Sequence, residues 1–327
     1  MIITITLNPA VDKTVEIQDF EVGTVNRVAS VRLDAGGKGI NVSKVIKSLG
    51  GESCAAGILG GSTGNFIKDC LNDMGIENKF LCIEGETRIN LKVVDSKRKS
   101  NTDINEPGPL IAEEEITAFE KMIFGMIKED SVVVFSGSVP ANVDKAIYGK
   151  WIRAAKETGA KTILDADGGL LKYGIEAGPY MVKPNIHELE SFFGEKIEGV
   201  AEAESCARKL IDIYGVGFVA VSLGHNGAVF LNKDYSLFAN SIDVEVKSTV
   251  GAGDSMVAAL THSLDMGYGF EKSALLAVAS ATANVMTSGS QPADIKTIKE
   301  LESKVKFEYI HKIKQVKGVA GNENKGC

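Results

Sequence analysis

Short apolar runs rich in β-branched residues alternate along this chain with longer segments in which apolar residues recur every three or four positions. The runs predict strands over residues 2–7, 53–58, 132–135, 162–164, 180–182 and 218–222. The longer segments predict helices over residues 39–48, 65–74, 112–128, 143–158 and 201–213. Strands separated by helices form parallel sheets that are buried on both faces, so we expect an α/β fold with a mainly parallel sheet. Ligands of such folds gather at the carboxyl ends of the strands.

Two segments depart from this rhythm. Residues 13–33 alternate like strands around Gly23, and residues 90–104 are typical of a hairpin around residues 96–98. Neither segment has a helix of its own to cover it, so each must close over a ligand or lie against a partner subunit. We therefore expect one domain over residues 1–315 with a small β-lid at about 13–33 and 88–105. The lid is expected to form a homodimer, and residues 316–327 are expected to be a disordered tail.

The net charge and the cysteine content limit the kinds of ligand and partner that we expect. The net charge of −7 disfavours a broad surface for nucleic acid or anionic membranes, so positive charge is expected only in a local pocket for a small anion. The five cysteines are scattered and odd in number, which fits neither a disulfide framework nor a zinc site. No apolar run reaches the length of a membrane span. We expect a cytoplasmic protein with no nucleic-acid or membrane partner.

The segment 248–256 carries the strongest chemical signal. It lies between a strand-like run, 242–247, and a helix that begins near Gly253. Gly251 and Gly253 allow a tight turn that brings bare N–H groups of the helix N-terminus against a phosphate. Asp254 lies in the first turn, where it can accept a hydroxyl proton beside those donors. The alternative is a plain turn with Asp254 as an ordinary N-terminal helix residue.

A second glycine-rich turn, residues 34–41, follows a strand and opens a helix that carries Lys38 and Asn41. It matches neither the Walker motif nor the dinucleotide-binding fingerprint. Either its backbone N–H groups form a second site for an anion, or its glycines are required only for close packing of the helix on the sheet. Asp12 follows the first strand, where it is either a turn residue or an acceptor for sugar hydroxyls.

Other candidates each have a structural alternative. Asn185 and Glu188 form a capping pair or, alternatively, an oxygen-rich corner that places Mg²⁺ through water with Lys183 facing phosphates. The segment 222–227 is a hairpin turn or a loop that wraps a nucleotide. Arg88 precedes the predicted hairpin, where an arginine is suited to bidentate capture of a phosphate ester.

Taken in order, Asp12, residues 36–41, Lys183 to Glu188 and residues 249–256 resemble the PfkB sugar kinases of ribokinase-like fold, over nearly the whole chain. The resemblance implies a three-layer α/β/α fold, with ATP and Mg²⁺ as cofactors. It implies that Asp254 takes the hydroxyl proton while Gly251, Ala252 and Gly253 surround the transferred phosphoryl group. It assigns the remaining roles as follows: Asp12, Gly37, Lys38, Asn41, Arg88, Ser138 and Arg27 to the sugar phosphate; Lys183, Asn185, Ser222, Gly224, Gly227, Ser248, Val250 and Asn284 to the nucleotide; Glu188 and Asn185 to the metal ion.

Within that family the chain is most similar to the bacterial sugar-phosphate kinases, through residues 87–90 and 102–109. This implies transfer from ATP to fructose 1-phosphate, giving fructose 1,6-bisphosphate, with tagatose 6-phosphate as the alternative substrate. A non-catalytic sugar-phosphate sensor is a second class, and a nicotinamide-dependent oxidoreductase is disfavoured because its fingerprint is absent.

Overall fold

The computed structural model describes residues 1–312 and contains two sheets within that range. The larger sheet has ten strands, parallel from β11 to β5 and antiparallel from β11 to β14. In spatial order its strands are β14 (Phe307–Lys312), β13 (Tyr235–Ala239), β12 (Ala228–Asn232), β11 (Phe218–Ser222), β10 (Met181–Val182), β9 (Lys161–Asp165), β8 (Val132–Ser136), β1 (Ile2–Thr6), β4 (Ser53–Gly60) and β5 (Glu77–Ile83). The central strands are buried on both faces, as expected for a parallel sheet that helices cover on both sides.

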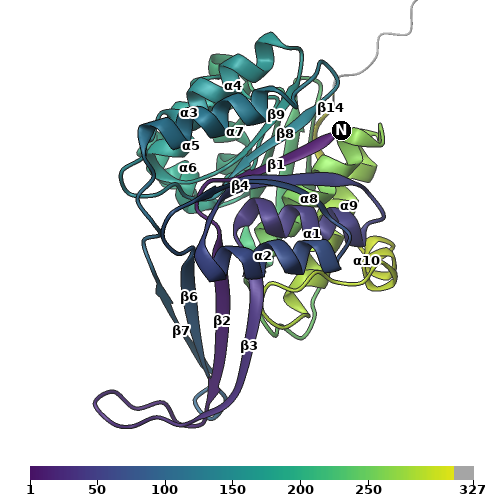
Figure 1. The fold of residues 1–327 in the computed structure, drawn as a ribbon. Coiled ribbons are helices and arrows are strands. Elements are labelled where there is room, and N and C mark those ends of the chain that lie inside the picture. The colour runs from purple at the N-terminus through teal and green to yellow at the C-terminus, as the bar shows by residue number, and fades with distance from the viewer. Residues whose placement is uncertain (313–327) are drawn as a thin grey trace, which may run out of the picture.

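Helices cover both faces of this sheet and bury two separate apolar clusters (Figure 1). One layer contains α3 (Glu113–Phe124), α4 (Ile147–Glu157), α5 (Gly168–Ile175), α6 (Ile186–Phe193) and α7 (Val200–Tyr214). The other contains α1 (Lys38–Ser48), α8 (Ala252–Asp265), α9 (Phe270–Val285) and α10 (Ile295–Glu302). The predicted α/β/α fold with a mainly parallel sheet is confirmed. Among residues 1–312, no helix is both long and apolar enough to cross a membrane.

The smaller sheet, here called the lid, projects from the body as a single layer (Figure 1). Its order is β3 (Val28–Gly36), β2 (Ala10–Ile17), β6 (Arg88–Asp95) and β7 (Ser100–Asn105). The segments 13–33 and 88–105 thus lie side by side, joined by parallel pairing of β2 with β6. Helix α2 (Gly61–Asp73) packs beneath the root of the lid, against Val11 and Ala35.

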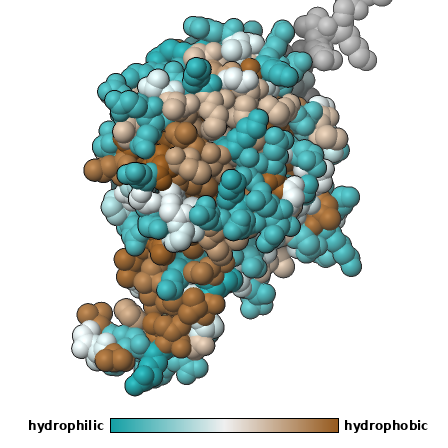
Figure 2. Space-filling view, viewed as in Figure 1, coloured by the Kyte–Doolittle hydropathy of each residue, from teal (hydrophilic) through white to brown (hydrophobic). Residues whose placement is uncertain are grey.

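The two faces of the lid differ in chemistry because successive side chains of a strand point to opposite sides. Polar residues of one face line the cavities between the lid and the body; they are Asp12, Thr14, Glu16, Ser30, Arg32, Asp34, Asn90, Lys92 and Asp103. Their neighbours on the other face include Val15, Val31, Leu33, Leu91, Val93 and Ile104. Figure 2 shows this apolar character as a brown patch over the lid.

Some predicted elements differ from the structure. The run 242–247 alternates as a strand does, yet it pairs with no strand of the described chain. Ile242, Val244 and Val246 line a cavity instead, together with Asp243. Strands β5, β13 and β14 and helices α5 and α10 were not predicted. The predicted tail, residues 316–327, lies outside the described residues.

Candidate active site

The carboxyl ends of five parallel strands meet at one cavity of about 630 Å³, which we call the sugar cavity after the ligand expected from the sequence. Thr6, Ser138, Asp165, Lys183 and Ser222 line it directly after or at the ends of β1, β8, β9, β10 and β11. The lid supplies the opposite wall, through residues such as Asp12 and Asn90. The expectation that distant motifs meet at one sheet edge is therefore satisfied.

The glycine-rich turn before α8 forms one wall of the sugar cavity. Gly251 has φ +83°, a left-handed conformation that a glycine adopts without strain, and it precedes the first residue of the helix. No side chain caps this helix N-terminus, so its first N–H groups face the cavity region as donors for an anion. A Cβ on Gly253 would lie 3.4 Å from Nζ of Lys183, which brings an ammonium group next to those donors.

Asp254 lies in the first turn of α8 and is 7% exposed. Its Oδ2 accepts a 2.8 Å hydrogen bond from Nδ2 of Asn41 in α1. Burial, and next the charge of Asp165, raise the pKa of Asp254 to about 6, while Lys38, Asn41 and Lys183 oppose that rise. A carboxyl group with this pKa is ionised at neutral pH and is better matched to a proton acceptor role than an exposed aspartate.

Asp165 at the end of β9 joins two lysines beneath Asp254. Its Oδ1 lies 3.4 Å from Nζ of Lys38 and 3.2 Å from Nζ of Lys183, while its buried Oδ2 has no partner among the described protein atoms. Although burial opposes ionisation, Lys183 and Lys38 hold the pKa of Asp165 below its usual range. In return, Asp165 raises the pKa of Lys38. Sequence reasoning did not select Asp165, although a carboxylate directly after a buried strand is the same signal that selected Asp12.

Arg88 and Asp12 lie on the lid side of the sugar cavity. Arg88 is held by its Nη atoms, which donate 3.0 Å hydrogen bonds to the carbonyl oxygens of Glu106 and Asn8. Its Nε is buried without a partner in the described chain. Asp12 accepts a 3.1 Å hydrogen bond from Asn90, and burial raises its pKa. Gly37, Lys38, Asn41 and Ser138 line the same cavity, as do Lys183, Asn185, Glu188, Val250, Gly251, Gly253 and Asp254.

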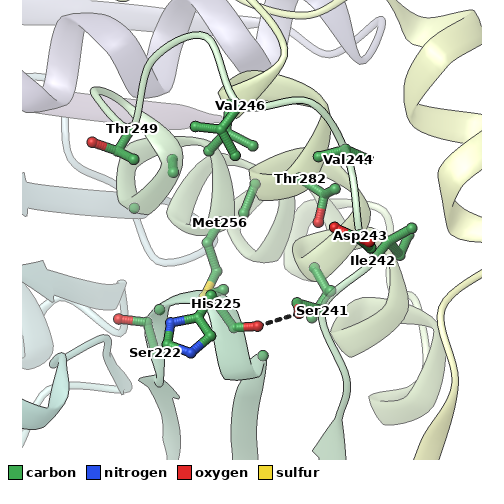
Figure 3. Close-up of a pocket in the computed structure, with 17 residues that line it drawn as sticks. Ser222, His225, Ser241, Ile242, Asp243, Val244, Val246, Thr249, Met256 and Thr282 are labelled. Atoms are coloured by element: carbon green, nitrogen blue, oxygen red, sulfur yellow. Dashed lines mark hydrogen bonds between the residues drawn. The ribbon is translucent and has the colours of Figure 1, made fainter. Parts of the chain in front are cut away.

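Figure 3 shows the residues that line a second cavity of about 630 Å³, which we call the base cavity after the nucleotide expected from the sequence. Ser222 and Gly253 line both cavities, so the two spaces meet at the start of α8. Ser222, Gly224 and Gly227 were predicted to contact a nucleotide and lie here. Its walls also include residues that the sequence did not single out: Ile242, Val244, Val246, Met256, Val278, Thr282 and Val285. Met256 and His225 are also part of its wall, and Figure 3 marks the hydrogen bond that the carbonyl oxygen of His225 accepts from Oγ of Ser241.

The pair Asn185 and Glu188 forms a capping box at the start of α6. Oδ1 of Asn185 accepts from the backbone N–H of Glu188, and Oε2 of Glu188 accepts from the backbone N–H of Asn185, each at 2.9 Å. The structural alternative is thus present, and Oδ1 of Asn185 already has a donor. Glu188 still lines the sugar cavity, and burial raises its pKa.

Three predicted site residues lie elsewhere. Arg27 is exposed just before β3 and lines neither cavity, because β3 runs nine residues, about 30 Å, from that point to the root of the lid. Ser248 faces a separate space between the lid and Gly289, and its Oγ accepts from the N–H of Val250. Asn284 is 1% exposed and lies beneath the turn, where a Cβ on Gly251 would be 3.3 Å from its Oδ1.

Known proteins match this chain over most of its length. A 1-phosphofructokinase of Bacillus subtilis (strain 168) is 37% identical, over 88% of this chain and 93% of that relative. A 1-phosphofructokinase of Borreliella burgdorferi is 34% identical, over 95% and 99%. The crystal structure of Escherichia coli phosphofructokinase-2 in complex with substrates and products has a TM-score of 0.89 and 27% identity, over 93% of this chain and 98% of that one.

The sequence model of the pfkB family carbohydrate kinases matches residues 3–298. This range includes both glycine-rich turns, the lid and all residues that line the two cavities. The chain therefore belongs to the pfkB family of carbohydrate kinases.

Proposed function

We propose that this protein transfers the γ-phosphoryl group of ATP to the free primary hydroxyl of fructose 1-phosphate, giving fructose 1,6-bisphosphate and ADP. The observation that carries the proposal is the position of Asp254, a buried carboxylate where a largely apolar base cavity meets a polar sugar cavity. The 1-phosphofructokinases of B. subtilis and Borreliella burgdorferi, named for the same reaction, support the choice of substrate.

In this proposal Asp254 accepts the proton of the attacking hydroxyl. The hydroxyl oxygen bonds to the γ-phosphorus as the bond from that phosphorus to the bridging oxygen of ADP breaks, so ADP leaves with the electron pair. The N–H groups at the start of α8 and the ammonium of Lys183 neutralise charge on the phosphoryl oxygens. Little covalent chemistry is required of the protein, and most of the rate comes from alignment and charge stabilisation.

We assign the phosphate already on the sugar chiefly to Arg88. Its Nε is buried and unpartnered among the described residues, and its Nη atoms are fixed by two carbonyl oxygens, so its orientation is set before substrate binds. Lys38 interacts electrostatically with Asp254 and Glu188, which places its charge at the transfer end of the cavity. Asp12 and Ser138 are assigned to sugar hydroxyls.

Mg²⁺ fits the oxygen-rich corner of the sugar cavity as a partner of the ATP phosphates. The residues described contain no cluster of three or more metal-binding side chains, so phosphate oxygens and water would supply most ligands. Glu188 and the unpartnered Oδ2 of Asp165 are the carboxylate oxygens suited to hold it, directly or through water. When bound, the ion neutralises phosphate charge.

A substrate panel tests the proposed reaction. With Mg-ATP and a coupled assay of ADP release, kcat/KM should be highest for fructose 1-phosphate, lower for tagatose 6-phosphate and lowest for neutral fructose. Preference for tagatose 6-phosphate would reassign the substrate. A higher kcat/KM for neutral fructose would show that Arg88 does not bind a phosphate on the substrate. No turnover with any sugar would favour a non-catalytic sugar-phosphate sensor.

We also propose that the protein forms a homodimer through the apolar face of the lid. Val31 is 56% exposed, Leu33 47% and Ile104 53%, on the part of this face beyond the root, which α2 covers at Val11 and Ala35. Val22 and Val25 in the loop at the lid tip are 91% and 85% exposed. A second copy would bury these side chains. The related E. coli phosphofructokinase-2 has a tetrameric inhibited form, which supports assembly as a property of similar chains.

A further inference from the structure

Lys44 is a buried lysine of α1 that lines neither the sugar cavity nor the base cavity. It is 5% exposed. Its Nζ donates a 2.7 Å hydrogen bond to the carbonyl oxygen of Ala35 and a 3.3 Å hydrogen bond to Oδ1 of Asn41. Ala35 belongs to β3 at the root of the lid, and Asn41 lies one turn before Lys44 in α1. The ammonium group therefore bridges the lid and the active-site helix.

This bridge decides which way the side-chain amide of Asn41 faces. An amide has one accepting and one donating end, and an ammonium group can only donate. With Oδ1 turned to Lys44, Nδ2 is turned to Asp254 and donates to its Oδ2 at 2.8 Å. The reversed amide would turn its NH₂ group to the ammonium group of Lys44 and its oxygen to the carboxylate of Asp254.

We propose that Lys44 is a positioning residue for the transfer reaction, which holds the Asn41 amide so that Asp254 accepts its hydrogen bond and ties this pair to the root of β3. The inference rests on the proposed role of Asp254 as proton acceptor. It adds a residue outside the cavities whose effect is transmitted through one hydrogen-bonded neighbour.

The charges around the chain of contacts are consistent with an ammonium group at this position. Burial lowers the pKa of Lys44, whereas the carboxylates of Asp34 in β3, Asp12 in β2 and Asp254 in α8, and also Cys70 in α2, act in the opposite direction. Each of these groups belongs to a different element packed around α1, and together they offset part of the cost of burying the ammonium group.

The groups around Asp254 determine how its pKa changes when Lys44 is replaced. Burial and Asp165 in β9 raise the pKa of Asp254, and Lys38, Asn41 and Lys183 lower it. A misdirected Asn41 amide removes one of the three stabilising partners of the ionised form. Asp254 then takes up a proton at a higher pH, and a smaller fraction of the enzyme is active near neutrality.

The experiment compares Lys44→Met with Lys47→Met. Lys47 is a lysine of the same helix that is partly exposed and pairs with Glu52 at 3.2 Å. In Lys44→Met, the acid limb of the kcat profile with fructose 1-phosphate should move up by about one pH unit. The KM for ATP should stay within roughly twofold, because no nucleotide contact is changed. Lys47→Met should keep the wild-type profile.

Additional variants separate positioning from folding. Asn41→Leu should reproduce the displaced limb, and the double variant Asn41→Leu, Lys44→Met should move it no further, because both changes break one linkage. Lys44→Gln, which keeps an N–H donor, is measured beside Lys44→Met, with melting temperatures for each. Because Lys44→Gln retains a donor for Oδ1 of Asn41, its acid limb should lie closer to that of wild type than the limb of Lys44→Met. An unmoved acid limb in Lys44→Met overturns the inference, and if that variant melts below wild type, an unmoved limb in Asn41→Leu does so. If Asp254→Asn keeps wild-type kcat, the proposed role of Asp254 fails instead.

Discussion

Nδ2 of Asn41 donates to Oδ2 of Asp254 across 213 residues of sequence, at 2.8 Å. The bond joins the helices that follow the two glycine-rich turns, so two turns that each suit an anion converge on one carboxylate. The sequence indicated both turns as separate features. The structure shows that they form parts of the same wall of the sugar cavity.

Replacing Asp254 by Asn should remove turnover and leave binding intact. The amide has the same shape and can still accept the hydrogen bond from Asn41, but it cannot take a proton. We expect kcat to fall by roughly 10²-fold or more, with ATP affinity by calorimetry close to wild type. Asp265→Asn, at the far end of the same helix, is the control and should keep full activity. A kcat near wild type for Asp254→Asn would exclude proton transfer to this residue.

The pH profile of the wild-type enzyme should show an acid limb set by Asp254. The pKa of this group is raised to about 6, and the proton acceptor works only when ionised. Activity is therefore present above that pH and is lost as the pH falls through it, about tenfold for each further unit. Steady-state kcat/KM measured from acidic to neutral pH tests this. A limb near the usual pKa of an exposed aspartate would contradict the raised value.

Replacing Arg88 by Met should weaken sugar-phosphate binding selectively. Loss of a charge-assisted contact to phosphate is expected to raise the KM for fructose 1-phosphate by roughly 10²-fold while the KM for ATP changes little. Arg153→Met, an exposed arginine of α4, is the matched control. If the weak activity on neutral fructose falls as much as that on the phosphorylated sugar, Arg88 does not contact the phosphate.

Glu86 should affect the same KM through the short segment that leads into β6 of the lid. Its carboxylate accepts from the backbone N–H groups of Ser62 and Thr63, each at 3.1 Å, and thereby caps α2 two residues before Arg88. These bonds lower its pKa to about 2, so the cap persists over the assay range. Glu86→Ala should raise the KM for the sugar phosphate several-fold, about three to ten times, with kcat retained. Glu84→Ala, a change at an exposed residue of the same segment, should leave the KM for the sugar phosphate at its wild-type value. An equal rise in KM for both variants would show that Glu86 has no such role.

A charge on the apolar face of the lid should abolish the proposed dimer. Leu33 is 47% exposed in β3, and Leu33→Glu would bring two like charges into an interface formed by two copies of this face. Light scattering should give the mass of a dimer for wild type and of a monomer for the variant. Ile213→Glu, a change at a residue of α7 that is 68% exposed, should leave the mass unchanged. A monomeric wild-type protein would refute the interface.

The layered fold and the two lid segments follow from periodicity, because strands and helices have different repeats, although β5, β13, β14, α5 and α10 were not predicted. Asp12, Arg88 and Asp254 were selected from their positions beside strands or turns, and all three line the sugar cavity. Asp254 reaches the cavity from the first turn of the helix that follows the glycine-rich turn. Asp12 and Arg88 reach it from the lid strands β2 and β6, so Asp12 does not lie at the carboxyl end of the first strand as its position suggested.

The rest depends on tertiary contacts that no local pattern encodes. In the sequence, nothing distinguishes Lys44 from other helix lysines. It is buried because α1 packs against β3. Asn284 suggested a nucleotide contact, yet the approach of α9 places it under the Gly251 turn. Arg27 suggested a phosphate contact, but the length of β3 separates it from the cavity. Asp165 was overlooked although its position after a buried strand was visible.

The alternation of the lid strands restricts how this family member can change. In each of these strands, polar side chains that face the body alternate with apolar side chains that face away from it. Insertion or deletion of a single residue within β2 or β6 would move the polar side chains beyond that point to the apolar face, and the apolar side chains to the polar face. Lengthening of these strands by evolution or by engineering is thus compatible with the present arrangement only in steps of two residues, or at the tip, beyond the last paired position.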